Sequence, residues 1–303
     1  MKILGIEASG LVASTALWED GVLKAEYTVN NRLTHSQTLL PMTAELMRMS
    51  EEKLENLDAV AVSAGPGSFT GLRIGAATAK GLALAMKIPV ISLSSLRSLA
   101  ENEADAEDML VVPIMDARRG QVYCGAWKNG EAVLPERACG IEELLNVLEA
   151  AVGKQTPDRI SGAASGSTCR GVIFLGDGVP VHKELIEERA HFPHRFAAAN
   201  NQRQRAASVA QLGAAVYAAW LSAHGLSAAE AKERGADALS EAGVFDGQVM
   251  NSDEFVPIYL RKPQAEREKD AGLLEDPGAH SLKKLRRGLK PRENGSADGK
   301  ERC

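Results

Sequence analysis

The chain has 303 residues, of which 45% are hydrophobic and 25% charged, as in ordinary soluble proteins with sizeable cores. Its formal net charge of −5 argues against a protein that coats nucleic acid, because that role depends on excess lysine and arginine. No stretch reads as a bilayer span, and Glu7 interrupts the first apolar run too early for a signal-peptide core, so we expect no membrane contact. The scattered cysteines, expected to be reduced thiols, predict a cytoplasmic location.

The first 30 residues predict three consecutive strands. Residues 2–8 are mostly apolar, and residues 13–18 alternate between apolar and polar. The dipeptide Asp20-Gly21 is a strong hairpin signal and precedes a further strand over residues 22–29. The chain therefore opens with an antiparallel meander.

A helix rich in methionine is expected next, over residues 34–49. Methionine is over-used at adaptable binding surfaces, and a helix that is apolar over more than one face needs a second surface to bury it. The seven-residue pairs Leu39/Leu46 and Leu40/Met47 fit one side on a sheet and another on a partner. Ordinary core packing is the alternative interpretation of the same pattern.

The strongest pattern in the chain is residues 65–81, GPGSFTGLRIGAATAKG. It begins directly after an expected strand over 59–64 and continues into an expected helix over 70–86. Free backbone N–H groups at such a helix start often bind phosphate. However, Thr70 stands where a dinucleotide fingerprint needs its third glycine, and Leu72-Arg73 where a P-loop needs Lys-Ser/Thr. The turn is therefore predicted to be a hinge that presents a recognition helix, with anion binding as the alternative.

A second strand-rich unit is expected after the acidic stretch 101–108, which follows a strand over 89–93 and a short helix near 94–101. The elements expected beyond that stretch are strands over 109–115 and 121–127, a hairpin turn at Lys128-Asn-Gly130, a helix over 141–152, a surface loop over 156–171, a strand over 172–175 and an alanine-rich helix over 206–224. The last helix should pack back against one of the two units.

The order strand-strand-strand-helix-strand-helix-strand is that of one half of an actin-like ATPase or ribonuclease-H-like fold, an α/β class with mixed sheets flanked by helices. We expect two subdomains, residues 1–102 and 103–262, the second of which includes the helix 206–224. Residues 283–292 hold six basic residues and no acid, so residues 263–303 should form a disordered basic tail. The cysteines lack a C-x-x-C pair and are expected to be reduced thiols: Cys124, Cys139, Cys169 and Cys303.

Six blocks of the sequence stand in a familiar order and spacing. They are residues 3–9 (ILGIEAS), His35-Ser36 with residues 39–41 (LLP), residues 65–81, residues 88–90 (IPV) with 94–96 (SSL), residues 116–118 (DAR) with 121–123 (QVY), and residues 257–261 (PIYLR). With these blocks the chain resembles the family of tRNA threonylcarbamoyladenosine biosynthesis protein TsaB. Residues 155–170 and those after about Glu268 have no counterpart in the resemblance.

The resemblance implies partnership rather than catalysis by this chain alone. TsaB proteins are similar to a degenerate copy of the catalytic subunit TsaD, which transfers a threonylcarbamoyl group to adenosine 37 of certain tRNAs with help from the ATPase TsaE. The implied pairing surface is the two helices over residues 34–49 and 70–86, with tRNA met only through the complex and a homodimer when the chain is alone. The implied interface positions are His35, Leu39, Met42, Leu46, Phe69, Thr70, Arg73, Ile74 and Ala77.

The rival interpretation is an active actin-fold ATPase or small-molecule kinase. Glu7 and Ser9 stand where actin-like ATPases place a phosphate hairpin, with glutamate in place of the usual aspartate. The further candidate positions for a nucleotide are Gly67, Ser68 and Asp177. We expect no required cofactor, and ATP or ADP at the interface of the complex is compatible with the subunit interpretation.

Two other residues bear on the chemistry. The catalytic relative holds its metal with the motif H-x-x-x-H, whereas Leu39 follows His35 at that spacing here, so no metal site is expected. Arg73 falls in the first turn of its helix, where the helix dipole disfavours a cation. We expect it to face a local carboxylate, an anion or the partner protein, and we favour the partner.

Overall fold

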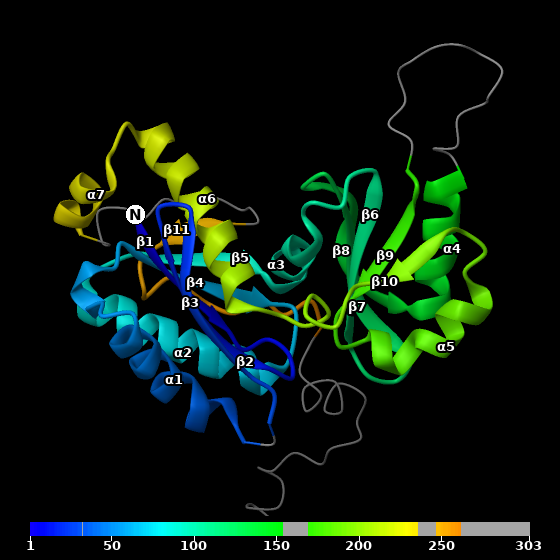
Figure 1. Cartoon of the computed structure of the whole chain (residues 1–303), viewed down its shortest axis with the longest axis horizontal. Coiled ribbons are helices and arrows are strands. Elements are labelled where there is room, and N and C mark those ends of the chain that lie inside the picture. The colour runs from blue at the N-terminus through cyan, green and yellow to red at the C-terminus, as the bar shows by residue number, and fades with distance from the viewer. Residues whose placement is uncertain (32, 154–168, 236–246, 262–303) are drawn as a thin grey trace, which may run out of the picture. The chain divides into compact units, whose positions relative to one another are not determined.

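The computed structural model describes residues 1–31, 33–153, 169–235 and 247–261. Residues Met1–Leu260 form one compact unit that contains two mixed β-sheets, and Arg261–Cys303 is assigned to a second unit (Figure 1). The expected tail over 263–303 lies outside the described residues, as does the expected loop over 156–171 except for its last three residues.

The first sheet has the order β11-β5-β4-β1-β2-β3. Its strands are β1 (Lys2–Glu7), β2 (Ala13–Glu19), β3 (Val22–Val29), β4 (Ala59–Gly65), β5 (Val90–Ser94) and β11 (Gln248–Met250). The first three strands pair antiparallel, whereas β4 and β5 run parallel to β1. Positive φ angles at Asp20 (46°) and Gly21 (88°) form the expected hairpin turn.

The second sheet repeats this arrangement in the order β10-β9-β6-β7-β8. Its strands are β6 (Met109–Asp116), β7 (Gln121–Lys128), β8 (Glu131–Gly140), β9 (Gly171–Leu175) and β10 (His194–Phe196). Strands β6, β7 and β8 form an antiparallel meander, and β9 and β10 run parallel to β6. Two sheets of this topology confirm the predicted actin-like architecture.

Helices cover both faces of the first sheet. Leu4, Val60 and Val62 point to one face, where they pack against α1 (His35–Met49) and α2 (Phe69–Met86). Residues on the opposite face, among them Ile3 and Ala61, pack against α6 (Ala206–His224). The faces alternate along β1 and β4 because side chains of a strand point to opposite sides.

The alanine-rich helix α6 packs closely on the sheet through small residues. A Cβ on Gly213 would lie 2.5 Å from the Cβ of Ala61, and a Cβ on Gly5 would lie 2.4 Å from the carbonyl oxygen of Ala206. This helix is long and apolar enough to cross a bilayer, so the prediction that no stretch has such a character was wrong. Half of the helix is buried against the first sheet, however, as in the core helix of a globular protein.

The second sheet has α4 (Ile141–Gly153) and α5 (Val179–Arg189) on one face and α3 (Ser95–Ala100) on the other. The remaining short elements are the 3-10 helices η1 (Leu54–Asn56) and η2 (Glu101–Glu103) and the helix α7 (Ala228–Arg234). The sequence did not predict α5, α7, β10 or β11. The predicted subdomain boundary at residue 102 lies between β5 and β6 in the chain, and it stays a prediction.

Three of the four cysteines are free and buried: Cys124, Cys139 and Cys169. This agrees with their prediction as reduced thiols. Cys303 lies outside the described residues.

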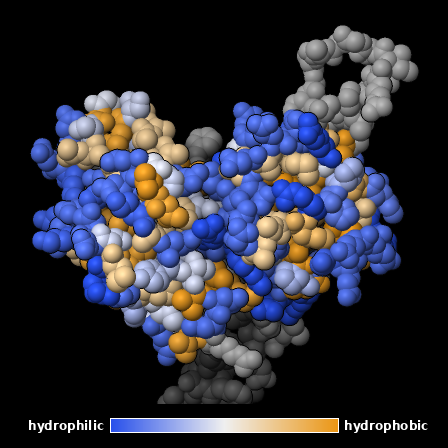
Figure 2. Space-filling view, in the orientation of Figure 1, coloured by the Kyte–Doolittle hydropathy of each residue, from blue (hydrophilic) through white to orange (hydrophobic). Residues whose placement is uncertain are grey.

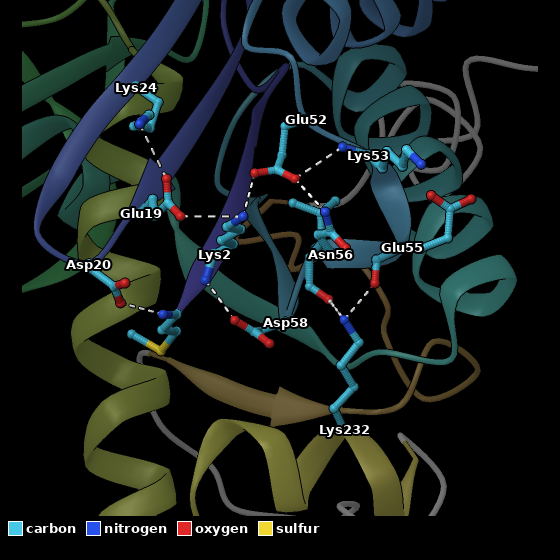
Figure 3. A network of polar contacts seen from close by, with 12 residues as sticks. Lys2, Glu19, Asp20, Lys24, Glu52, Lys53, Glu55, Asn56, Asp58 and Lys232 are labelled. Carbon is cyan, nitrogen blue, oxygen red and sulfur yellow. Dashed lines mark hydrogen bonds and ion pairs between the residues drawn. The ribbon is translucent and has the colours of Figure 1, made fainter.

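A network of hydrogen bonds and ion pairs connects the start of β1 to neighbouring segments (Figure 3). The ammonium group of Lys2 pairs with Glu52 and lies 3.3 Å from Glu19, while its backbone N–H donates to Asp58 at 2.7 Å. Lys232 of α7 donates to the carbonyl oxygens of two residues in the segment before β4, at 2.6 and 2.8 Å. The network therefore joins four distant segments of the chain around the first sheet.

Candidate interaction surface

Three glycines of the turn after β4 bring backbone segments into direct contact. A Cβ on Gly67 would lie 2.2 Å from the carbonyl oxygen of Ser9, and one on Gly71 would lie 2.1 Å from that of Ala8. Gly65 has a φ of +134°, and a Cβ there would lie 2.1 Å from the carbonyl oxygen of Ile258, near the end of the described chain. The glycines are thus required for packing the β1–β2 turn and the C-terminal segment onto the start of α2.

The backbone N–H and hydroxyl groups with which this turn could bind a phosphate form hydrogen bonds within the protein. The backbone N–H of Ser68 donates to the carbonyl oxygen of Ser9 at 2.7 Å, and the Ser68 hydroxyl caps α2 by accepting from Gly71 N–H at 3.3 Å. Four of the predicted nucleotide positions do meet here: Glu7, Ser9, Gly67 and Ser68. Ser9 bonds to Glu7 and to Ser68, so the polar groups of these three residues are engaged with one another.

Glu7 shows the same inward orientation. Only 1% exposed, it accepts hydrogen bonds from the backbone N–H and the hydroxyl of Ser9, both at 2.6 Å, and from the hydroxyl of Ser63. Burial raises the pKa of this carboxyl, against the opposing effect of the hydrogen bonds. Glu7 therefore joins β1, the β1–β2 turn and β4.

The fifth predicted nucleotide position, Asp177, belongs to the second sheet. It follows β9 and accepts a hydrogen bond from the backbone N–H of Asp116 at 3.2 Å. Burial raises the pKa of Asp177. Within the described ranges, no three His, Cys, Asp or Glu side chains are grouped as metal ligands.

The predicted interface positions on α1 divide into core and surface. Leu39 and Leu46, both predicted as interface positions, are 1% and 0% exposed and belong to the core of the first sheet. Met42 is half-buried, and His35 bonds the carbonyl oxygen of Gly10 through its Nε2 at 3.1 Å. Of the two seven-residue pairs, Leu39/Leu46 faces the sheet, whereas in the other pair Leu40 is exposed and Met47 is buried.

The residues that α1 does expose are apolar. Leu40 is 54% exposed and Met49 58%, and neither is among the interface positions implied by the family resemblance. Apolar side chains reach the surface at the lower edge of Figure 2, where Figure 1 places α1. This helix thus buries one side against the sheet and leaves apolar side chains on its outer side.

On α2, three of the predicted positions are exposed and fall on one helical face: Thr70, Arg73 and Ala77. The same spacing continues to Gly81 and to Leu84, which is 64% exposed. Phe69 and Ile74 are half-buried. The exposed face of α2 is therefore narrow, contains small residues and ends in a leucine.

This face has little charge. Helix α2 contains no acidic residue, and on α1 the acidic residue Glu45 pairs with Arg48 at 2.6 Å. Lys80 of α2 donates to the carbonyl oxygens of Asp253 and Phe255 at 3.3 and 3.1 Å. We call the outer sides of α1 and α2 together the α1/α2 face.

The segment 251–260, which we call the strap, lies beside the start of α2. The backbone N–H of Ile258 donates to the carbonyl oxygen of Ala64 at 2.7 Å. Its exposed apolar residues are Val256, Ile258, Tyr259 and Leu260. Its last residues belong to the block PIYLR over 257–261, which carries no sequence signal for a contact with α2.

Comparisons with known proteins agree with this architecture. The family model described as "TsaD: tRNA N6-adenosine threonylcarbamoyltransferase" matches residues 30–269. The structure of YeaZ from Pseudomonas aeruginosa superposes with a TM-score of 0.55 at 23% identity, covering 85% of this chain and 99% of that one. A second structure, described as an uncharacterized protein from the same organism with similarity to peptidase YEAZ, gives 0.57 at 24% identity over 86% and 99% of the two chains. These structures support the fold.

Relatives found by sequence identify the family of this chain more specifically than the solved structures do. The tRNA threonylcarbamoyladenosine biosynthesis protein TsaB of Escherichia coli is 37% identical over 132 residues, which is 43% of this chain and 57% of that protein. The protein of the same name from Bacillus subtilis is 34% identical over 230 residues, covering 75% of this chain and 92% of that protein. With this coverage and the match to the TsaD model, the chain belongs to the TsaB family.

Proposed function

We propose that this chain is a non-catalytic subunit of the complex that makes N6-threonylcarbamoyladenosine at position 37 of tRNA. In this proposal it docks through the α1/α2 face onto a catalytic paralogue of the TsaD type. The observation that carries the proposal is an exposed apolar face on two helices, in a chain whose relatives are named for this biosynthesis. Exposed apolar helix faces of this kind typically pack against another protein.

The remaining members of the complex follow from the same proposal. A TsaE-type ATPase joins the pair, tRNA is bound through the complex rather than by this chain alone, and the complex works in the cytoplasm. The chain requires no cofactor of its own, and ATP or ADP binds, if at all, at the interface of the complex. The inward hydrogen bonds of Glu7 and Ser68 support this over the ATPase or kinase alternative.

When the partner is missing, the α1/α2 face should be covered by a second copy. Leu40, Met49 and Leu84 would otherwise remain in water, which costs free energy in proportion to the apolar area exposed. We therefore propose a homodimer that exchanges for the heterodimer when the TsaD-type subunit is added.

The test is co-expression of the chain with the TsaD-type protein of the same organism, followed by size-exclusion chromatography with light scattering. The expected result is a heterodimer at micromolar concentration. In parallel, deletion of the gene should remove threonylcarbamoyladenosine from tRNA hydrolysates, and the wild-type gene should restore it. The proposal is lost if no complex forms and the nucleoside persists in the deletion strain. Nucleotide turnover by the isolated chain would favour the ATPase or kinase instead.

A further inference from the structure

An exposed arginine near the start of α2 contacts two aromatic side chains, one in the same helix and one from a distant part of the chain. The guanidinium carbon of Arg73 lies 4.1 Å from the ring centroid of Phe69. Its Nε–H group donates to the hydroxyl of Tyr259, 186 residues away, at 3.4 Å. The rings of Phe69 and Tyr259 contact each other, with centroids 5.2 Å apart.

The strap that carries Tyr259 is itself anchored. Ile258, next to Tyr259, bonds Ala64 at the end of β4, and Lys80 of α2 holds the backbone of the strap at two carbonyl oxygens. The arginine is therefore positioned by β4, α2 and the strap together. A side chain fixed in this way loses less conformational entropy when it binds a partner than a free one does.

The charge of Arg73 is unusual in its surroundings. As the fifth residue of α2, Arg73 lies just beyond the first turn, near the helix end whose dipole disfavours a cation. Among the described residues, no carboxylate lies within ion-pair distance of Arg73, and the acid of α1 is already paired with Arg48. Since α2 contains no acid and the one acid of α1, Glu45, is paired with Arg48, these two helices offer no unpaired carboxylate to Arg73 of a second copy.

We propose that Phe69, Arg73 and Tyr259 form a docking site for a carboxylate group on the partner subunit. This inference rests on the proposed function and commits to the TsaD-type subunit, rather than a second copy of this chain, as the occupant. With Nε engaged by Tyr259, the two terminal nitrogens of Arg73 remain to bind a carboxylate as a fork. The exposed apolar residues of the strap would surround this ion pair and exclude water from it.

The test measures the dissociation constant of the heterodimer by calorimetry at two salt concentrations. Arg73→Glu should weaken binding at least about 30-fold, because it places a negative charge opposite the partner's carboxylate. Arg73→Lys should have an intermediate effect, since lysine lacks the fork. Tyr259→Phe keeps the ring but loses the hydroxyl, and should weaken binding about 2- to 10-fold.

The matched control is Arg189→Glu on α5, a charge reversal at an exposed arginine of the second sheet, which should leave the dissociation constant unchanged. Thermal unfolding of each variant checks the fold, and Arg73→Lys and Tyr259→Phe remain informative if the reversal impairs folding. The inference is overturned if the wild type binds the partner and Arg73→Glu binds it equally well, or if Arg73→Glu weakens only self-association. Failure of the wild type to bind would instead overturn the proposed function.

Discussion

The two sheets share one strand order, but the helices at equivalent places differ in their outer surfaces. Helices α1 and α2, with 15 and 18 residues, contain four Asp, Glu, Lys or Arg residues in total, whereas α4 and α5, with 13 and 11 residues, contain eight. On α4 and α5 these groups pair within and between the helices, as Lys183 does with Glu187 and Arg189 with Glu142.

This difference teaches that the topology alone does not create a docking surface. The same strand–helix–strand unit occurs twice. Its first copy leaves Leu40, Met49 and Leu84 more than half exposed on its helices, whereas the helices of the second leave Val181. The ion pairs of α4 and α5 are typical of a surface that faces water, and exposed pairs of this kind add little stability. We infer that the first sheet was shaped for a partner and the second for solvent.

The largest expected effect is a loss of stability that distinguishes the buried side of α1 from its exposed side. Leu39→Ala should lower the free energy of unfolding by about 2–5 kcal/mol, because Leu39 is 1% exposed and its loss leaves a cavity. Leu40→Ala should change it by less than about 0.5 kcal/mol, yet weaken partner binding. Urea unfolding and calorimetry measure the two quantities. Equal losses of stability would show that Leu40 also belongs to the core.

The next effect concerns the glycine junction. Gly71→Ala should lower the free energy of unfolding by about 1–3 kcal/mol or more, since its Cβ would lie 2.1 Å from the carbonyl oxygen of Ala8. Gly81→Ala in the same helix meets no atom within 4 Å and should raise stability by about 0.5–1 kcal/mol. Thermal and urea unfolding of both variants give the comparison. A Gly71→Ala protein as stable as Gly81→Ala would refute the close approach.

A smaller effect is the pH dependence that Glu7 imposes on the first sheet. Burial raises its pKa above the value of about 4.5 expected when unfolded, so the folded state retains a proton that the unfolded chain has lost. Stability should therefore fall as the pH rises from about 4.5 to the raised pKa, by at most about 1.4 kcal/mol per pH unit. Glu7→Gln should remove this slope in urea unfolding at pH 4.5–7. Parallel curves for the two proteins would contradict the raised pKa.

The smallest effect belongs to the polar network around Lys2. The hydrogen bonds from Asn56 and Lys2 lower the pKa of Glu52 to about 2. Its contribution to stability should therefore be present above about pH 4.5 and be lost as the pH falls toward 2. Glu52→Gln should be slightly less stable than the wild type at pH 7 and equal to it near pH 2, with partner binding unchanged. A deficit that persists at pH 2 would have another cause.

Much of the fold could be predicted because its signals are local. Alternation and the Asp20-Gly21 turn gave the meander, and the alanine-rich helix was placed at residues 206–224 as found. The elements α5, β10 and β11 were missed, since three-residue strands and a weakly amphipathic helix of 11 residues carry little periodicity.

The interaction surface was harder to predict because its contacts join residues far apart in the chain. The glycines after β4 have the pattern of an anion site, and only the folded chain brings the carbonyl oxygens of Ser9 and Ile258 against them. The contact of Arg73 with Tyr259 gives no local signal either. The prediction that Arg73 faces the partner rested on its place near the start of the helix and on the resemblance to the TsaB family.

The central claim is that the first sheet, and not the second, meets the partner. Hydrogen–deuterium exchange of the chain alone and with an excess of the TsaD-type subunit tests it most directly, since docking slows exchange where amides become covered. The account predicts slower exchange in α1, α2 and the strap, with α4 and α5 unchanged. Slower exchange confined to α4 and α5 would contradict it.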